Sequence, residues 1–242
     1  MITKSEINII RSLGDRAGRS EHGLFVVEGD KSIAEICNAG FKIVRMFTTT
    51  DGPGLKIRPS DMARISSHKS PPDRLALFKI PERKIDFQLI NKDLTLVLDD
   101  VQDPGNLGTI IRLADWFGIK QIICSPATVD VFNQKTIQAS MGSISRVNVQ
   151  YIPLEDFFKQ VNNIPIFGTF LEGEDIYTSQ LSHPAIIVMG NEGKGISDAT
   201  SKFTNRRITI PPYPHDATTV ESLNVAMATA VVCSEFRRRM KK

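Results

Sequence analysis

Cysteine is scarce in this chain of 242 residues, which contains three cysteines and no CxxC pair. Cys37, Cys124 and Cys233 lie far apart in the sequence, and none of the four histidines is close to any of them. Disulfide frameworks and zinc sites need such residues at short, regular spacings. We therefore expect three reduced thiols and no metal site.

Long hydrophobic runs are also missing from the sequence. No stretch approaches the roughly 20 continuous apolar residues that a membrane-spanning helix needs, so we expect no membrane partner. The segment MITKSEINII lacks the apolar core and small-residue cleavage site of a secretion signal. We expect a cytoplasmic globular protein, long enough for one large domain or two modest ones.

Two common phosphate-binding fingerprints do not occur. The turn GNEGKG (190–195) follows an apolar run, but its glycine spacing is neither that of GxGxxG nor that of a Walker A loop. By itself such a turn is typical of a tight connection between a strand and a helix. Its glycines would also let the backbone approach a ligand closely. Whether the turn is only a connection or part of a binding site therefore depends on the loops that lie near it.

The positive charge is concentrated in the first part of the chain. Residues 1–92 hold 16 Lys and Arg against 11 Asp and Glu, whereas residues 93–242 hold 14 against 16. This asymmetry favours a polyanionic partner, such as a nucleic acid, bound by the first third of the chain. An ordinary solvated surface would carry a similar excess, so charge alone leaves both interpretations open.

Two segments with different patterns indicate two units. The first reads as a small α/β unit over residues 1–80, and the polar stretch 81–93 breaks the pattern and is expected to be a linker. In this unit we expect strands at 23–29, 41–49 and 74–80, and a helix at 30–40.

The second segment, residues 94–242, alternates short apolar runs with helical patterns, which predicts an α/β domain with a mostly parallel sheet. We expect its strands at 94–100, 120–125, 164–170, 185–191 and 207–211, and its helices at 106–117, 133–141, 153–161 and 222–239.

Three polar, Gly- or Pro-rich loops follow strands of this second segment. They are DDVQDPGNLG, GNEGKG and PPYPHDATTVESLN. Ligands of open parallel sheets bind beyond the carboxyl ends of the strands, where such loops converge. The three loops together therefore predict a binding site there for a nucleotide-like ligand.

The first loop leads into an amphipathic helix. Asp103, Pro104 and Gly105 form a turn, and Asn106 is a suitable N-cap residue. Arg112 lies roughly opposite the apolar stripe that we expect to enter the core. It is either an ordinary surface arginine or a residue that contacts a ligand at the start of the helix. The stripe consists of Leu107, Ile110, Ile111, Ala114 and Phe117.

The third loop leads into the last helix of the chain. Ser222 or Asn224 is expected to cap this helix. Alanines recur at positions 226, 228 and 230, which makes the helix slim and suits close packing against another element or a second subunit.

Together the three loops resemble the three sequence motifs of the SpoU/TrmH-type RNA ribose 2′-O-methyltransferases, members of the trefoil-knotted SPOUT superfamily. The matching stretches are DPGNLGTIIRLADWFG, IIVMGNEGKGIS and ITIP with ESLNVAMATAVV. The segment 129–149 also looks like the stretch that joins the first two motifs in the family. FVVEGDKSIAEICNAG is similar to the ribosomal-protein-like substrate-binding domain of many members.

The resemblance implies a knotted catalytic domain that binds S-adenosylmethionine and methylates a ribose 2′-hydroxyl. It also implies a homodimer that packs through the knotted domain, and RNA as the partner of residues 1–80. The residues implied for the cofactor site are Gly190, Asn191, Glu192, Gly195, Ile210, Leu223 and Asn224. Those implied for methyl transfer are Asn106, Arg112, Glu192, Ser222 and Asn224.

Family proposals make the arginine at the position of Arg112 the general base. A guanidinium stays protonated in proteins, so we expect Arg112 to clamp a phosphate beside the target ribose instead. We expect ribosomal RNA as substrate, because the first domain is of the ribosomal type. The alternatives are transfer RNA, methylation of a base, or a knotted RNA-binding protein without activity. The last is left open because the link 212–221 is longer than is usual in the family and has no glycine.

Overall fold

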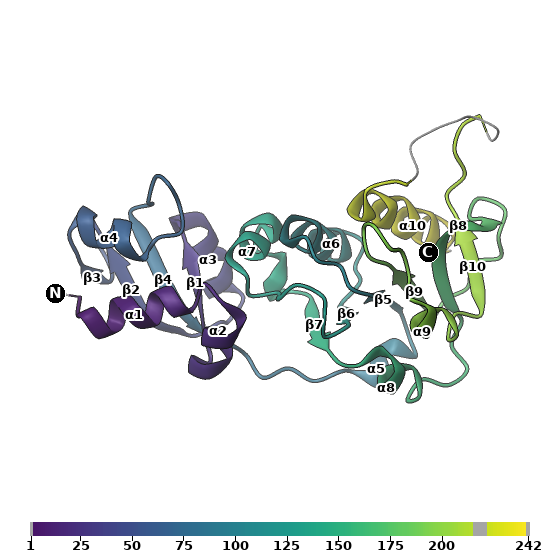
Figure 1. Ribbon diagram of the computed structural model, residues 1–242, viewed down its shortest axis with the longest axis horizontal. Helices are drawn as coiled ribbons and strands as arrows, with labels where there is room; N and C mark the ends of the chain where they lie inside the picture. Colours follow the sequence, from purple (N-terminus) through teal and green to yellow (C-terminus); the bar gives the residue numbers. More distant parts are fainter. Residues whose placement is uncertain (1, 215–221, 241–242) are drawn as a thin grey trace. The chain divides into compact units, whose positions relative to one another are not determined.

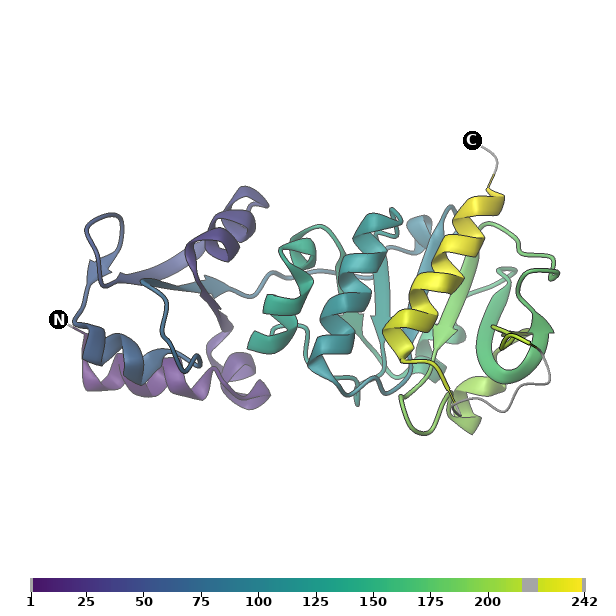
Figure 2. The same ribbon diagram turned by 90° about the horizontal axis from the view of Figure 1, so that it is seen from above.

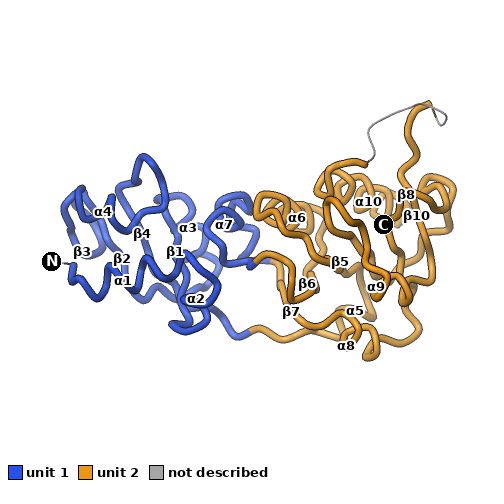
Figure 3. The backbone as a smooth tube through the Cα atoms, in the orientation of Figure 1, with its two compact units in different colours: residues 1–82, 130–146 blue, residues 83–129, 147–242 orange. Residues whose placement is uncertain are grey.

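The computed structural model describes residues 2–214 and 222–240. Its contacts divide the chain into two compact units, coloured separately in Figure 3. The N-terminal unit comprises residues 1–82 and 130–146, and the C-terminal unit comprises residues 83–129 and 147–242. No helix in the described part of the chain is both long enough and apolar enough to cross a membrane.

The N-terminal unit is built around a four-stranded sheet of order β1-β4-β2-β3 (Figure 1). β4 pairs antiparallel with β1 and β2, whereas β3 runs parallel to β2. The elements formed by its first 82 residues are α1 (Lys4–Ser12), α2 (Arg16–His22), β1 (Leu24–Glu28), α3 (Asp30–Asn38), β2 (Ile43–Thr48), β3 (Leu55–Lys56), α4 (Pro59–Ile65) and β4 (Arg74–Lys79).

Alternation along the strands gives this sheet two buried faces. Val26 and Leu75 point to a core that also contains Ile7 and Ile10 of α1 and Met62 of α4. Phe25 and Phe78, on the other face, stack with their ring centroids 5.6 Å apart. Figure 2 shows α1 and α4 along one side of the sheet and α3 along the other.

Residues 130–146 group with the N-terminal unit although the sequence pattern assigns them to the second segment. They form α7 (Gln134–Ser140) and the 3-10 helix η1 (Ser143–Ser145). The Arg19 guanidinium, almost completely buried, lies 2.6 Å from a carboxylate oxygen of Asp130. The ring of Phe132 packs 4.7 Å from that of Phe25. A buried ion pair and an aromatic contact thus attach this segment to the N-terminal unit.

The C-terminal unit contains a six-stranded sheet of order β10-β8-β9-β5-β6-β7 in which every pairing is parallel, as the sequence predicts. Its elements are α5 (Phe87–Ile90), β5 (Leu94–Leu98), α6 (Pro104–Trp116), β6 (Gln121–Cys124), β7 (Asn148–Tyr151), α8 (Leu154–Phe158), β8 (Ile166–Asp175), β9 (Ala185–Met189), α9 (Asp198–Ser201), β10 (Arg206–Thr209) and α10 (Val225–Arg239).

Helices cover both faces of this sheet, so its central strands are buried throughout. α6 and α10 pack side by side on one face (Figure 2). On the other face Ile90 of α5 and Phe157 of α8 share a core with Val97 and Val188 of the strands.

The strand order reverses beside β5. β6 and β7 extend the sheet to one side of β5, whereas β9, β8 and β10 lie on the other side. The loops that follow β5 and β9 therefore leave neighbouring strands at the reversal point, which is where open α/β sheets bind their ligands.

Candidate functional site at the ends of β5, β9 and β10

A cavity of about 520 Å³ lies beyond the carboxyl ends of β9 and β10. The turn 190–196 forms one wall, and the segment 169–172 of β8 forms another. The part of the lining that the structure describes is completed by residues 207–210, the start of α10, and Ile176, Met189 and Val232. The size is within the range of sites for small ligands and cofactors.

The turn after β9 is closed by backbone hydrogen bonds. The N–H of Asn191 donates to the Gly195 carbonyl and the N–H of Gly195 donates to the Asn191 carbonyl, both at 2.9 Å. A Cβ on Gly190 would lie 2.2 Å from the carbonyl carbon of Gly195, so only glycine allows the two ends to approach this closely. Gly195 adopts a φ of 70°, in the left-handed region that favours glycine.

Side chains join this turn to the loop after β5. A carboxylate oxygen of the buried Asp99 accepts the N–H of Ser197 at 2.9 Å. Asp100 takes a φ of 63°, and its carbonyl accepts the side-chain amide of Asn191 at 2.7 Å. Asn191 and Ser197, on either side of the turn, therefore join it to the loop after β5, which is about 90 residues away in the sequence.

Glu192 makes the third link between these loops. Its carboxylate accepts the side-chain amide of Asn106 at 2.9 Å and the backbone N–H groups of Gln102 and Asp103 at 3.3 Å. The Asn106 Oδ1 atom in turn accepts the side-chain amide of Asn224 at 3.0 Å. We call Glu192, Asn106 and Asn224 the amide cluster, because the side-chain amides of Asn106 and Asn224 connect α6 to the start of α10.

The start of α6 differs from the prediction. The N-cap residue is Asp103, whose carboxylate accepts the N–H of Asn106 at 2.8 Å, and Pro104 occupies the first helical position. Proline suits that position because the missing N–H would have no partner there. Asn106 therefore lies within the first turn and is not the cap, which leaves both ends of its amide for the amide cluster.

The last helix begins at Val225, later than the predicted start at residue 222. Asn224 is its N-cap, and the Asn224 Oδ1 atom accepts the N–H groups of Ala226 and Met227. This confirms one of the two predicted caps and excludes the other, since Ser222 precedes the cap. The Nδ2 atom of Asn224 is consequently directed toward Asn106.

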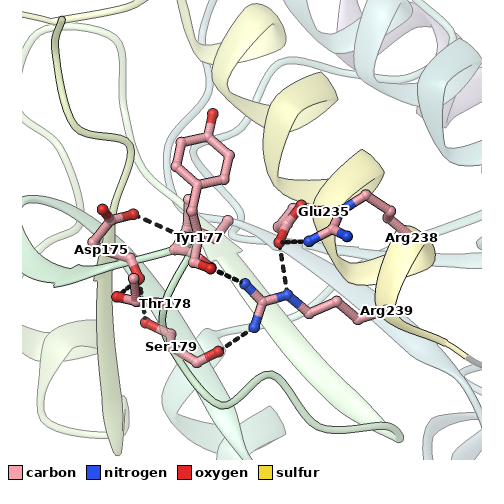
Figure 4. A network of polar contacts seen from close by, with 8 residues as sticks. Asp175, Tyr177, Thr178, Ser179, Glu235, Arg238 and Arg239 are labelled. Carbon is pink, nitrogen blue, oxygen red and sulfur yellow. Dashed lines mark hydrogen bonds and ion pairs between the residues drawn. The ribbon is translucent and has the colours of Figure 1, made fainter.

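The other end of α10 is fixed by arginines (Figure 4). The Arg239 guanidinium donates to the carbonyls of Ile176, Tyr177 and Ser179, in the segment after β8. Glu235 accepts from Arg238 at 2.8 Å and from Arg239 at 2.6 Å. The hydrogen bonds from Arg238, helped by those from Arg239, outweigh burial and lower the pKa of Glu235 to about 2.

Seven of the predicted site residues line the cavity: Gly190, Asn191, Glu192, Gly195, Ile210, Ser222 and Leu223. Asn106 and Asn224 lie in the amide cluster, next to the cavity through Glu192. Arg112 belongs to neither group and is exposed on α6. It follows Asn106 by six residues, which is about 9 Å along a helix axis.

Sequence reasoning did not identify the wall formed by β8. Thr169, Phe170, Leu171 and Glu172 line the cavity together with Arg207 of β10. The stretch FGTFLEGED carries no loop signal except its glycines at 168 and 173, so the sequence predicts only the end of an ordinary strand near residue 170. The strand instead continues to Asp175 with a large bulge.

The lining suits an organic cofactor held by peptide groups and apolar side chains. Met189, Ile196 and Leu223 contribute apolar surface, while the turn 190–195 contributes backbone groups. Within residues 2–214 and 222–240 no group of three or more His, Cys, Asp or Glu side chains is arranged to bind a metal ion.

Two family profiles match the chain. Residues 93–234 match the SpoU rRNA Methylase family, and residues 4–71 match the MRM3-like substrate binding domain. Among curated proteins, the 23S rRNA (guanosine(2553)-2′-O)-methyltransferase RlmP of Bacillus subtilis is 28% identical, and the alignment covers 94% of each chain.

Solved structures agree with these matches. A putative RNA methyltransferase of the TrmH family from Porphyromonas gingivalis superposes with a TM-score of 0.86 at 37% identity, over 99% of this chain and all of that one. An AdoMet-bound rRNA methyltransferase from Sinorhizobium meliloti gives a TM-score of 0.86 at 27% identity, over 100% and 97% of the chains. The resemblance inferred from the three loops is thereby confirmed, and the chain belongs to the SpoU rRNA methylase family.

Proposed function

We propose that this protein transfers the methyl group of S-adenosylmethionine to a ribose 2′-hydroxyl in ribosomal RNA. The observation that carries this proposal is the amide cluster, which joins α6 and α10 to the turn that lines the cavity. It brings residues of three separate sequence motifs to one place. The B. subtilis relative is named as a 23S rRNA 2′-O-methyltransferase.

The cavity fits S-adenosylmethionine. The missing Cβ of Gly190 lets the turn 190–195 fold back on itself, so that peptide groups take part in the lining. Peptide groups can hydrogen-bond a purine and a ribose, and Ile210 and Leu223 can pack against the adenine ring. The bound cofactor would supply a methyl group on a sulfonium, which needs no metal or further activation.

The contribution of the chain is to position the 2′-hydroxyl for attack on the sulfonium methyl, which leaves S-adenosylhomocysteine, and to favour transfer of the hydroxyl proton to a phosphate oxygen or water. Asn106, Asn224 and Ser222 are polar groups at the cavity edge that can orient the ribose. Glu192 holds Asn106 in place by accepting its amide. We assign Arg112 to a phosphate beside the target ribose, because its planar fork matches phosphate and its charge stabilises a developing alkoxide.

The N-terminal unit supports an RNA substrate. Residues 4–71 match a substrate-binding family, and the first 92 residues carry the excess of positive charge. Ribose chemistry requires RNA, since DNA lacks the 2′-hydroxyl. We assign residues 1–80 to RNA binding, residues 81–93 to a linker and residues 94–242 to methyl transfer, although α5 (Phe87–Ile90), within the linker range, packs into the core of the C-terminal unit. We expect the protein to work in the cytoplasm.

We further propose that the C-terminal unit is knotted and forms the homodimer. The cavity is lined both by the turn after β9 and by the start of α10, an arrangement that a trefoil knot would produce. α6 and α10 pack together, and each exposes a large apolar side chain, Trp116 at 83% and Met227 at 60%. Exposed apolar surface on two adjacent helices suits a second copy of the chain.

A radiolabelled methyl-transfer assay tests the activity. The protein is incubated with labelled S-adenosylmethionine and either ribosomal or transfer RNA, and the RNA is then digested to nucleosides. Label in a 2′-O-methylated nucleoside from ribosomal RNA is the expected result. Label in transfer RNA alone favours the tRNA alternative, label on a base favours base methylation, and no label favours an inactive RNA-binding protein. The long link 212–221 is the reason for keeping the inactive RNA-binding alternative. Its residues 215–221 lie outside the described part of the chain.

A further inference from the structure

Two residues of opposite charge, Arg207 and Glu172, lie on one wall of the cavity. Both line it, Arg207 from β10 and Glu172 from the neighbouring strand β8. In the described part of the chain neither side chain takes part in an ion pair within 4.0 Å. The wall therefore offers one acidic and one basic group to whatever occupies the cavity.

A bulge in β8 creates this wall. Arg207 pairs with Gly168, but the next residue of β10, Ile208, pairs with Glu174, so five residues of β8 loop out between them. The loop is held at Thr169, whose hydroxyl donates to the Val188 carbonyl at 3.0 Å. It is also held at Leu171, whose carbonyl accepts the hydroxyl of Thr209 at 3.0 Å. These contacts fix the backbone that carries Phe170 and Glu172.

Glycine is required where the bulge closes. A Cβ on Gly173 would lie 2.9 Å from the carbonyl oxygen of Arg207 and 3.0 Å from the carbonyl carbon of Ile208. The end of the bulge thus packs directly against the backbone of β10. A larger residue at position 173 would displace the end of the bulge, next to Glu172.

Phe170 orients the Arg207 guanidinium. The guanidinium carbon lies 3.6 Å from the centroid of the Phe170 ring, close enough for a stacked cation–π contact. Stacking on a ring limits the rotamers of a long side chain and leaves the edges of the guanidinium, which carry its N–H donors, available. An arginine fixed in this way can bind a carboxylate through two parallel hydrogen bonds.

We infer that Arg207 and Glu172 recognise the amino-acid end of S-adenosylmethionine. This inference rests on the proposal that S-adenosylmethionine is the cofactor. The α-carboxylate is the sole anionic group of that molecule, since adenine and ribose are neutral and the sulfonium and ammonium are cations. Arg207 binds the carboxylate, and Glu172 accepts from the ammonium beside it. Phe170 is a positioning residue that acts through Arg207.

Two other charged residues line the described part of the cavity, Glu192 and Lys194. Glu192 already accepts three hydrogen bonds from the loop after β5 and from α6. Lys194 follows Glu192 by two residues in the turn after β9, and in the described residues it has no stacking contact like that of Arg207 on Phe170. Arg207 is therefore the better match for a zwitterion, and Lys194 is the competing candidate in the test.

Calorimetric titration of the full-length protein with two ligands tests this inference. S-adenosylhomocysteine has the amino-acid end, whereas 5′-methylthioadenosine lacks it and keeps the adenosine. We expect Arg207→Gln to weaken binding of S-adenosylhomocysteine about tenfold and that of 5′-methylthioadenosine less than about twofold. Glu172→Gln and Phe170→Leu should produce smaller losses, about threefold, with the same selectivity.

Arg206→Gln is the matched control, since Arg206 is the preceding exposed arginine of β10 and does not line the cavity. It should leave both affinities unchanged. The inference is overturned if Arg207→Gln weakens both ligands equally, if it weakens neither, or if Lys194→Gln is the variant that loses the selectivity. Failure of the unmodified protein to bind either ligand would contradict the cofactor proposal itself, and this inference with it.

Discussion

The side-chain amide of Asn106 donates to the carboxylate of Glu192 at 2.9 Å, across 86 residues of sequence. A carboxylate can only accept, so Asn106 must direct its nitrogen to Glu192 and its oxygen to Asn224. The oxygen of Asn224 is occupied by two N–H groups of α10, so its nitrogen must face Asn106. Each amide therefore has one orientation, and the cluster fixes the position of α10 relative to α6.

Asn106→Asp tests the amide cluster. The new carboxylate would face Glu192 and would replace a hydrogen bond with repulsion between like charges. We expect the free energy of unfolding to fall by roughly 1–3 kcal/mol and methyl transfer to fall about 100-fold, because the ribose-positioning groups shift. Asn162→Asp, at an exposed position, is the control for the charge change. Equal activities of the two variants would contradict a positioning role for the cluster.

Two glycines of one turn should respond differently to alanine. Gly190→Ala places a Cβ 2.2 Å from Gly195, so the turn must open, and we expect affinity for S-adenosylhomocysteine to fall at least about tenfold. In Gly193→Ala the nearest atom, Oδ1 of Asn191, is 3.8 Å from the new Cβ, and binding should be almost unchanged. Titration calorimetry measures both. Unchanged binding by the Gly190 variant would exclude this turn from the cofactor site.

Arg112 should be needed for transfer but not for cofactor binding. The residue is exposed on α6 and does not line the cavity. We expect Arg112→Ala to bind S-adenosylhomocysteine within about twofold of the unmodified protein and to lose about 1,000-fold in methyl transfer. Arg112→Lys should also be inactive, because an ammonium lacks the planar two-point contact. A parallel loss of cofactor affinity, measured by calorimetry, would argue against the phosphate clamp.

The proposed dimer depends on the exposed face of α6 and α10. Trp116→Glu places a charge in that face, and we expect the protein to change from dimer to monomer in size-exclusion chromatography with light scattering. Val44→Glu changes a similarly exposed apolar residue of the N-terminal unit and should leave the dimer intact. A Trp116 variant that stays dimeric would place the interface elsewhere.

Stability at low pH should depend on Glu235. The pKa of this residue is about 2 in the folded protein, against an ordinary value of 4.5. The ionised form therefore stabilises the fold fully above about pH 4.5, and this contribution is lost as the pH falls from about 4.5 to about 2. The difference between the two pKa values sets an upper limit of about 3 kcal/mol on this contribution.

Urea unfolding of the unmodified protein and of Glu235→Gln measures this contribution. The difference in unfolding free energy between the two proteins should be largest near pH 7 and smaller near about pH 3. Comparing the two proteins removes the effects of the other carboxylates. A difference that stays constant with pH would show that the ionisation of Glu235 does not stabilise α10.

Most strands of the fold can be predicted because buried parallel strands are continuous apolar runs. β5, β9 and β6 follow this rule. β7 was missed because it lies at the sheet edge, where Asn148, Gln150 and Tyr151 are only half-buried. α1 is not among the predicted helices, although Thr3 as N-cap and Glu6 in the first turn form a capping box, a signal that the sequence contains.

The site was predicted only in part, and the reason is physical. Loops that follow adjacent parallel strands must converge, so Gly190 and Glu192 could be placed near the end of β5 from the pattern alone. The bulge of β8 depends on which strand pairs with β10, and no local signal encodes that pairing. Phe170 and Arg207 could therefore be recognised as lining the cavity only once the strand order was known.

The most direct test of the account is the nucleoside composition of ribosomal RNA after reaction with the protein and S-adenosylmethionine. Liquid chromatography with mass spectrometry should detect one 2′-O-methylated nucleoside with the unmodified protein and none with Arg112→Ala. A methyl group on a base, or equal methylation by both proteins, would contradict ribose methylation at this site.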